Sequence, residues 1–289
     1  MSRDWAAELA PLGLVPVGEI GSGMEGTVIR LEGDLVVKVW HSAGPDDLVV
    51  RQAFYADVAD ALPLRTTRIL DVVRVGDRWA SLEPLLHGTP LAGPPGDAAV
   101  DAVADVLAAL ASATPTAAMT TLAALPGEPP LDVSAGFGAG LADLVERRAN
   151  GVLAAAVPGF SAASVAAAVR SLPPAGPALV HGDLIPANVL LDDTGRPSAV
   201  LDFGFLTTVG DPAFDAAVTA SIFDMYGAAA RSTEARLDAR LDVDPRRAAV
   251  HRAAYAVVTA TCFSPTGEDG HFAWCVAMLA RDEVLAALR

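Results

Sequence analysis

The chain has 289 residues, 52% of them hydrophobic, and a formal net charge of −15 at pH 7. This length and apolar content allow a large buried core divided between two lobes, and they exclude a disordered chain. The acidic excess argues against binding to nucleic acid or to an anionic membrane surface, because both need clustered Lys and Arg. The same charge would concentrate a cationic small molecule, and it is equally consistent with simple solubility.

The cysteine content and the N-terminal stretch indicate the compartment. Cys262 and Cys275 are the only cysteines. They are too few for a disulfide scaffold and lack a zinc-type spacing, so we interpret them as small apolar side chains. Residues 1–13 contain acids and no apolar stretch typical of a signal peptide, and no apolar run in the chain reaches membrane-spanning length. We therefore expect a cytoplasmic protein with no nucleic acid and no membrane among its partners; the oligomeric state is left open.

The first third of the chain is predicted to form a small sheet with one helix. Residues 28–31 and 35–40 are rich in β-branched side chains and flank a tight turn at 32–34, which predicts a hairpin. Apolar residues at helical spacing predict a helix over 46–62. A further pair of strands is expected around the Gly-Asp at 76–77.

A Gly- and Pro-rich stretch over 87–97 interrupts this pattern and is the expected lobe boundary. It divides the chain into an N-terminal lobe over 1–86 and a C-terminal lobe over 87–289. The second lobe is predicted to be mostly helical, with a poorly patterned loop over 114–140 and helices over 97–113, 139–156, 161–171 and several segments after residue 213.

Three glycines, at positions 21, 23 and 26, form the pattern G-x-G-x-x-G-x-V up to Val28. In a dinucleotide-binding oxidoreductase such glycines open a helix, whereas in a kinase they form a hairpin over the ATP phosphates and a Lys follows in the next strand. The residues after Gly26 are β-branched, which counts against the dinucleotide interpretation. Lys38 lies one strand later, as the kinase interpretation requires. A glycine-rich hairpin without a ligand is the structural alternative.

The stretch "HGDLIPANVLL" and the stretch "AVLDFGF" at 199–205 carry the strongest chemical signal. The residues between them predict a strand, a turn and a strand, and this hairpin would bring Asn188 and Asp202 to the same end. Phosphoryl transfer requires a carboxylate that takes the proton of the acceptor hydroxyl, a role that suits Asp183. Mg²⁺ prefers carboxylate and amide oxygens, a role that suits Asn188 and Asp202.

The motifs H181-G-D-x-x-x-x-N188 and L201-D-F-G204, followed by "VGDPAFDAA" at 209–217, resemble the aminoglycoside phosphotransferase and choline kinase-like family of the protein-kinase-like fold. The resemblance implies an α+β bilobal protein-kinase-like fold. Its N-lobe would be a small antiparallel sheet with one main helix, and its C-lobe would be larger and mostly helical. It also implies that Asp183 is the catalytic base and that Asn188 and Asp202 hold Mg²⁺.

The resemblance assigns the other site residues as well. Lys38 would contact the α- and β-phosphates, and backbone groups between Glu83 and Leu85 would meet the adenine ring. The glycine-rich loop would cover the nucleotide with Gly21, Ser22, Gly23, Gly26 and Val28. His181 and Gly182 would shape the catalytic loop, while Asp211 and Asp215 would hold that loop or cap the following helix.

Two departures from the family pattern stand out. The helix of the small lobe usually offers a Glu to pair with the strand Lys, but here Gln52 occupies that place, or, in another register, Asp57 makes the pair. A neutral amide would orient Lys38 less strongly than a carboxylate. No activation-loop element follows Asp202, so a protein substrate is not expected.

The predicted function is an ATP- (or other NTP-) and Mg²⁺-dependent phosphotransferase that acts on a hydroxyl of a small molecule. An aminoglycoside or other antibiotic is the leading acceptor, and an amino sugar, sugar or amino alcohol is the alternative. Candidate acidic contacts for a cationic acceptor are Asp224, Glu268 and Asp269, although each is also typical of ordinary surface charge. A non-catalytic ATP-binding module is the competing class, since Gln52 weakens the Lys38 site.

Overall fold

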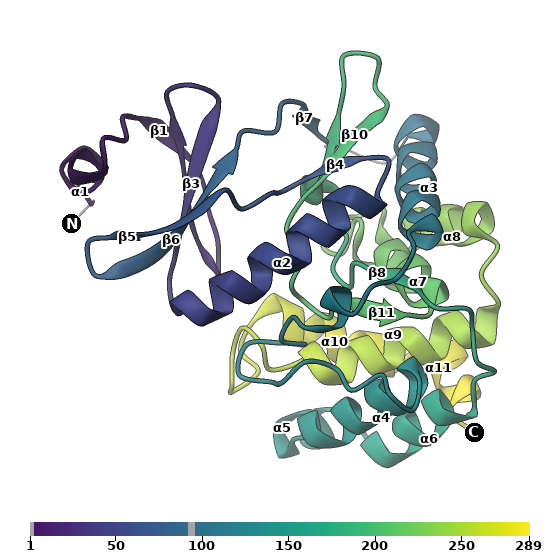
Figure 1. Ribbon diagram of the computed structural model, residues 1–289. Coiled ribbons are helices and arrows are strands. Elements are labelled where there is room, and N and C mark those ends of the chain that lie inside the picture. The colour runs from purple at the N-terminus through teal and green to yellow at the C-terminus, as the bar shows by residue number, and fades with distance from the viewer. Residues whose placement is uncertain (1–2, 92–95) are drawn as a thin grey trace.

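The computed structural model describes residues 3–91 and 96–289, which form a mixed α+β structure with an antiparallel sheet in the N-terminal part and helices in the C-terminal part. Figure 1 shows the two parts side by side, with the glycine-rich strands in one and the helical bundle in the other. The predicted fold class is therefore confirmed. Residues 92–95 of the expected boundary stretch lie outside the described residues, and the division at 86/87 stays a prediction.

The N-terminal sheet has five antiparallel strands in the order β1-β2-β3-β6-β5. Gly33 and Asp34 have φ angles of +79° and +57°, so the turn between β2 and β3 matches the twist of its strands. The strands are β1 (Pro16–Ser22), β2 (Gly26–Leu31), β3 (Leu35–Trp40), β5 (Asp71–Val75) and β6 (Arg78–Pro84).

Opposite faces of this sheet are covered by different helices. One face packs with Leu9 of the short N-terminal helix α1 (Trp5–Leu9), which a 3₁₀ turn follows at Ala10–Leu12. The long helix α2 (Pro45–Ala61) lies between the sheet and the C-terminal part in Figure 1. Its Phe54 ring is 5.6 Å from the ring of Phe203, so α2 belongs to the core of the second lobe as well as to the first.

A second sheet joins distant segments of the chain in the order β4-β10-β9-β7. The strands β9 (Val189–Leu191) and β10 (Pro197–Val200) form the predicted hairpin. The short strand β4 (Arg65–Thr66) pairs in parallel with β10, and β7 (Thr89–Pro90) pairs with β9. A separate pair of strands, β8 (Ala178–Val180) and β11 (Thr208–Gly210), flanks the motif that begins at His181.

The predicted helix over 139–156 is wrong as a single element, because it is two helices. Asn150 has an extended backbone, and its side chain accepts a hydrogen bond from the Leu153 backbone, which caps a new helix. The helices of this lobe are α3 (Asp97–Ser112), α4 (Phe137–Arg148), α5 (Gly151–Ala156), α6 (Ala162–Ser171), α7 (Pro212–Ile222), α8 (Ala230–Leu241), α9 (Pro245–Thr259), α10 (Gly270–Leu279) and α11 (Asp282–Ala287), with 3₁₀ turns at Ala118–Thr120 and Pro186–Asn188.

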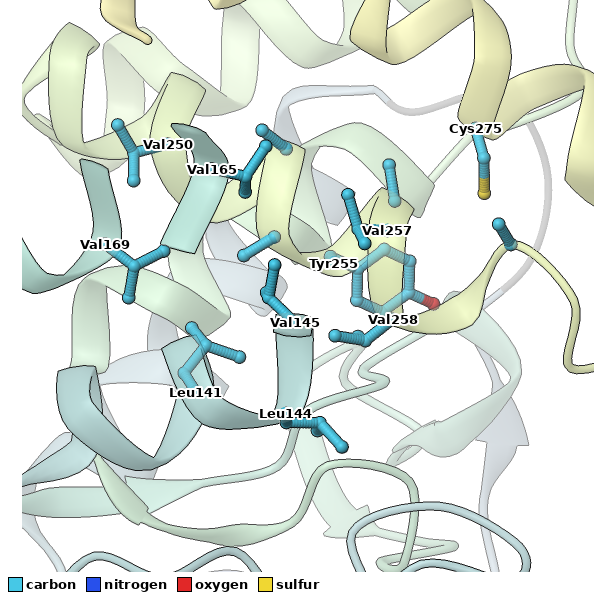
Figure 2. Close-up of a cluster of buried hydrophobic side chains, with 14 of the residues drawn as sticks. Leu141, Leu144, Val145, Val165, Val169, Val250, Tyr255, Val257, Val258 and Cys275 are labelled. Carbon is cyan, nitrogen blue, oxygen red and sulfur yellow. The ribbon is translucent and has the colours of Figure 1, made fainter. Parts of the chain in front are cut away.

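The helix α9 runs through the centre of the C-terminal lobe, and every residue from Ala248 to Thr259 is buried. Figure 2 shows Val250, Tyr255, Val257 and Val258 of this helix among side chains of α4 and α6. A buried Val or Leu contributes about 1.5–3 kcal/mol, so this cluster makes a rigid base for the loops above it. In the described part of the chain, no helix combines the length and apolarity needed to cross a bilayer.

Candidate active site

The loop that begins at His181 is shaped by a glycine that no other residue could replace without strain. Gly182 has a φ of +88°, and a Cβ added there would collide with the Phe205 carbonyl oxygen and lie 2.7 Å from the Leu206 carbonyl carbon. The Thr207 hydroxyl donates to the His181 carbonyl at 2.6 Å. The loop is therefore in direct contact with the segment that follows Asp202.

Asp215, near the start of α7, holds the same loop from below. Its two carboxylate oxygens accept hydrogen bonds from the backbone N–H groups of His181 (2.6 Å) and Gly182 (2.8 Å), and the residue is 3% exposed. Burial raises the pKa of Asp215 to about 7, although the two backbone donors oppose this shift. Asp211 caps α7 by accepting from the Ala213 backbone at 2.9 Å. Asp215 thus holds the catalytic loop and Asp211 caps the following helix, which are the two roles that the sequence suggested for this pair.

An Asp215→Asn variant is expected to lower the turnover number about tenfold to a hundredfold while leaving nucleotide affinity nearly unchanged. One of its two acceptor oxygens becomes an NH₂ group that faces a backbone N–H, so the loop loses an anchor, and a shift of about 1 Å in a reacting group can cost about a hundredfold in rate. Steady-state kinetics measures this effect. The control is Asp244→Asn at the start of α9, which keeps its capping oxygen; similar losses in both variants would contradict the assignment.

His181 serves the structure of the loop. Its ring is buried, its Nε2 lies 2.9 Å from the Leu201 carbonyl oxygen, and its Nδ1 accepts from the Asp183 backbone at 3.4 Å. Burial lowers the pKa of His181 to about 4, so the ring is neutral at pH 7. Both ring nitrogens already have protein partners, which agrees with the loop-shaping role and leaves no free nitrogen for a metal ion.

Asp183 is half-buried and has one partner that lies far away in the sequence. The hydroxyl of Tyr255, on α9, donates to Asp183 Oδ1 at 3.0 Å. Burial raises the pKa of Asp183 to about 6, and the tyrosine hydrogen bond opposes that shift. The carboxylate is therefore ionised above pH 7, with one oxygen engaged. Sequence reasoning missed Tyr255, because nothing in the pattern of a buried helix marks one aromatic residue as polar and functional.

Asn188 and Asp202 lie at the same end of the β9–β10 hairpin, as predicted. Val189 is directly opposite Val200, and the Leu201 backbone donates to the Asn188 carbonyl at 2.8 Å. The Asn188 side-chain NH₂ donates to the Asp183 carbonyl at 3.2 Å, which leaves its amide oxygen as the acceptor end. These two adjacent positions thus present a carboxylate and an amide oxygen, the ligand types that Mg²⁺ prefers.

These two oxygens alone would not make a complete metal cage. Within residues 3–91 and 96–289, no group of three or more His, Cys, Asp or Glu side chains is placed to hold a metal ion. Mg²⁺ usually keeps several waters and binds through one or two protein oxygens together with substrate phosphates. The residues present therefore fit a metal ion that arrives with a nucleotide.

Lys38, in the centre of β3, is held by two carboxylates. Its Nζ lies 2.8 Å from Glu25 Oε2 and 2.9 Å from Asp202 Oδ1. Burial acts to lower the pKa of Lys38, but the charges of Asp202 and Glu25 outweigh burial and raise it. In return, the ammonium group of Lys38 overcomes the effect of burial on Asp202 and lowers the pKa of that carboxyl. The pair is therefore fully charged at neutral pH.

Neither residue that the sequence suggested as the helix partner of Lys38 contacts it. The Gln52 side chain donates to the Ile69 carbonyl at 3.0 Å, and Asp57 accepts from the Thr116 hydroxyl at 2.6 Å. Both side chains have their hydrogen-bond partners outside β3, and the residue of α2 that reaches the site is Arg51. The expectation of a Gln52 or Asp57 pair is therefore wrong, and the carboxylate comes from Glu25 in the glycine-rich loop.

The glycine-rich loop is a hairpin between β1 and β2. Gly23 donates to the Gly26 carbonyl at 3.0 Å, and a Cβ on Gly26 would collide with the Val39 carbonyl oxygen. A Cβ added at Gly21 or Gly23 would meet no atom within 4 Å, so this side of the loop is open. Because a strand and not a helix follows Gly26, the dinucleotide interpretation is wrong.

The face of the sheet that carries Lys38 also carries the other residues predicted near the nucleotide. Val28 lies directly across from Lys38 in the strand register. Ser81, the partner of Lys38 on β6, donates to Glu83 Oε1, and burial raises the pKa of Glu83 to about 7. The Leu85 N–H is already bonded to the Asp34 carbonyl at 2.8 Å. A base contact from Leu85 would therefore use its carbonyl oxygen.

One of the three acidic residues predicted to contact the acceptor lines an open pocket near Asp183. The pocket, of about 380 Å³, is formed by Tyr226, Phe263, Asp269, Gly270 and His271. The ring of His271 is 6.4 Å from that of Tyr255, the residue that contacts Asp183. Asp269 Oδ1 caps α10 by accepting from the Phe272 backbone, while its Oδ2 is buried and has no hydrogen-bond partner.

The other two acidic candidates lie outside the lining of this pocket. The carboxyl group of Asp224 packs against Gly227, where an added Cβ would collide with it. Glu268 is exposed, and its backbone donates to the Ser264 hydroxyl at 3.2 Å. A larger pocket of about 530 Å³, lined in part by Phe137, Pro173 and His251, includes none of the residues proposed for catalysis.

Comparison with known proteins places this geometry among phosphotransferases. Residues 16–251 match the sequence profile described as "Phosphotransferase enzyme family". The fold is similar to that of a macrolide 2′-phosphotransferase, MphH, from Brachybacterium faecium, with 20% identity and a TM-score of 0.60 over 96% of this chain and 98% of that chain. No curated protein sequence matches the chain significantly.

Two further solved structures have the same fold. The GDP and kanamycin complex of APH(2″)-IIIa is 16% identical, with a TM-score of 0.64 over 95% of each chain. The ADP and streptomycin complex of APH(3″)-Id from Streptomyces rimosus is 18% identical, with a TM-score of 0.54 over 89% of this chain and 99% of that chain. At these identities the likeness shows the fold alone.

Proposed function

Because the chain belongs to the phosphotransferase enzyme family, we propose that it is a kinase that transfers the γ-phosphate of Mg-ATP, or of another NTP, to a hydroxyl group of a small molecule. The observation that carries the proposal is the convergence of Asp183, Asn188 and Asp202, with Lys38 bonded to Asp202. Phosphoryl transfer depends on positioning and on charge stabilisation, and this set offers both.

Asp183 would receive the proton of the acceptor hydroxyl. The Tyr255 hydroxyl occupies Oδ1 and fixes the carboxylate in orientation, which leaves Oδ2 for the acceptor. A pKa of about 6 keeps the group ionised at pH 7–8 while making it a stronger base than an exposed aspartate. The base and its orienting tyrosine thus match the task of aligning a hydroxyl for in-line attack.

The charged groups of the site would hold the nucleotide. Lys38 would contact its α- and β-phosphates below the open glycine-rich loop, and Asn188 and Asp202 would hold Mg²⁺ together with phosphate oxygens. When bound, this ion supplies neutralisation of the negative charge on the transferred phosphoryl group. Since the lysine is itself bonded to Asp202, the metal-binding and phosphate-binding groups form one unit.

The acceptor pocket favours a molecule with an apolar face and a cationic group. Tyr226 and Phe263 expose 70% and 50% of their surface, and Asp269 has a buried oxygen without a partner. Aromatic faces attract both apolar rings and ammonium groups. An antibiotic hydroxyl, on an aminoglycoside or on a more apolar ring as in macrolides, is the leading candidate, as the proteins of similar fold also suggest. An amino sugar, sugar or amino alcohol is the second candidate.

The competing class is a non-catalytic nucleotide-binding module. A module without chemistry would not need a half-buried carboxylate oriented by a tyrosine beside two metal-type oxygens, and this arrangement supports the catalytic proposal. The cytoplasmic location expected from the sequence stays a prediction.

A phosphorylation screen tests the proposal. Purified protein with Mg-ATP or Mg-GTP is expected to phosphorylate at least one member of a panel of aminoglycosides, macrolides, amino sugars and amino alcohols, as detected by mass spectrometry. Removal of Mg²⁺ with EDTA should abolish transfer, because the ion that Asn188 and Asp202 would hold is the group that neutralises the charge on the transferred phosphoryl group. The absence of Mg-nucleotide binding by calorimetry would contradict the proposal. Binding without any transfer or hydrolysis would favour the non-catalytic module.

A further inference from the structure

Glu25, near the tip of the glycine-rich loop, bridges two cations. Its Oε2 is 2.8 Å from Lys38 Nζ, and its Oε1 is 2.9 Å from Arg51 Nη2. Lys38 comes from β3 and Arg51 from α2, so this one carboxylate joins three separate elements. A Cβ added to Gly204 would lie 3.2 Å from both Glu25 Oε1 and Arg51 Nη1, which shows how closely the segment after Asp202 approaches the bridge.

Both cations lie against one aromatic ring. Lys38 Nζ is 4.1 Å and Arg51 Cζ is 4.6 Å from the centre of the Trp40 ring. Their side chains are only 13% and 17% exposed. Two positive charges so close together repel each other where water is scarce, and the carboxylate between them removes that repulsion. Asp202 also pairs with Lys38, but among these two carboxylates Glu25 is the one that pairs with both cations.

We propose that Glu25 is the positioning residue for Lys38 and that Arg51 holds Glu25 in place, an inference that rests on the proposed kinase function. The loop supplies the carboxylate and α2 supplies the cation, so the relay Arg51–Glu25–Lys38 takes the place of a direct pair between a helix carboxylate and the lysine. This arrangement accounts for the absence of an acidic partner at Gln52, whose side chain is bonded elsewhere.

The relay also connects the loop to the proposed metal site. Arg51 Nη1 donates to the carbonyl of Phe203 at 3.3 Å, directly after Asp202, and Lys38 bonds Asp202 itself. The glycine-rich loop, Lys38 and the segment that carries Asp202 are therefore linked through Glu25 and its two cationic partners. Loss of Glu25 should impair nucleotide use without unfolding the protein, since 32% of its side chain is exposed.

Three variants and one control test the relay, with Mg-ATP affinity by calorimetry and the slow hydrolysis of Mg-ATP as readouts. Glu25→Gln should lower kcat/KM for Mg-ATP about tenfold or more, because Lys38 loses one of its two charged partners and is then held by Asp202 alone. Arg51→Glu should be at least as impaired, since it places a second carboxylate beside Glu25. The double variant Glu25→Gln with Arg51→Glu should recover to within about threefold of the wild type, because α2 then offers a carboxylate directly to Lys38. The control Glu19→Gln removes an exposed charge from β1 and should change neither the affinity for Mg-ATP nor its hydrolysis.

Each result has a defined meaning. Unchanged or tighter Mg-ATP binding in Glu25→Gln would overturn the inference. Glu25 would then either have no role in nucleotide binding or compete with the phosphates for Lys38. A loss in Glu25→Gln that the double variant does not repair would also overturn it, because Glu25 would then act through loop structure and not through Lys38. If the wild type neither binds nor hydrolyses Mg-ATP, the kinase function itself fails, and that result is separate from a failure of the relay in an active enzyme.

Discussion

Replacement of Asp183 by asparagine is expected to reduce phosphoryl transfer about 10²–10⁴-fold and, at the same time, to make the protein more stable at pH 8. Transfer is lost because an amide cannot take the acceptor proton. Affinity for Mg-ATP should be unchanged, since Asp183 faces the acceptor. The variant keeps Oδ1 as the acceptor of the Tyr255 hydrogen bond, so the loop is not disturbed.

The gain in stability follows from the raised pKa of Asp183, about 6 in the folded protein. Folding raises the pKa of this carboxyl from about 4 in the unfolded chain to about 6. Its contribution to the free energy of unfolding is therefore largest below about pH 4 and is lost as the pH rises through about 6. At pH 8 the wild type therefore contains a desolvated charge that asparagine lacks. We expect a gain of about 1–2 kcal/mol in the free energy of unfolding. For a chain of this size, that corresponds to a rise of about 2–6 °C in Tm.

Thermal unfolding from pH 4 to pH 8 measures this effect. The difference between Asp183→Asn and the wild type should be largest at pH 8 and should vanish near pH 4. The control is Asp192→Asn in the β9–β10 turn, where hydrogen bonds from Thr194 and the Arg196 backbone lower the pKa of the carboxyl, so its loss should not stabilise the protein at pH 8. Full activity in Asp183→Asn, or a lower Tm than the wild type at pH 8, would contradict the assignment.

A Gly182→Ala variant is expected to lose about 3–5 kcal/mol of stability and nearly all activity. The residue has a φ of +88°, and the new Cβ would collide with the backbone carbonyl of Phe205. A backbone carbonyl cannot rotate away as a flexible side chain can, so the catalytic loop or the segment after Asp202 must move. Either movement separates Asp183 from the proposed metal site.

Denaturant unfolding and transfer kinetics measure this loss. The control for stability is Gly23→Ala, where an added Cβ meets no atom within 4 Å and the change should stay below about 1 kcal/mol. Equal stability of the two variants would show that the loop around Gly182 can relax, and the argument for a tightly fitted catalytic loop would fail.

The partner of Lys38 shows where prediction from sequence reached its limit. Helical spacing correctly placed α2, but the choice between positions 51 and 52 depends on a rotation of one residue, about 100° around the helix axis. Glu25 lies within the glycine pattern that the sequence shows, but a loop residue has no periodicity from which the direction of its side chain can be predicted. Only the folding of the hairpin over β3 brings its carboxylate to Lys38.

Tyr255 shows the same limit for the candidate site. It lies 72 residues after Asp183, within a helix buried on all sides, and its hydroxyl reaches Asp183 only because α9 crosses the lobe beneath the catalytic loop. The break between α4 and α5 is different, because Asn is a common N-cap residue and Asn150 therefore marks the start of α5 in the local sequence.

By itself, the sequence determined the features that depend on short stretches of chain: the two hairpins, the helix over 46–62, and the placement of Asn188 and Asp202 at one end of β9 and β10. These features are local, since turn residues and strand periodicity set them. The tertiary structure alone decided which distant groups meet, namely Tyr255 with Asp183 and Glu25 with Lys38. The physical reason is that such contacts depend on how whole elements pack, and no local pattern encodes the rotation and crossing of one element against another.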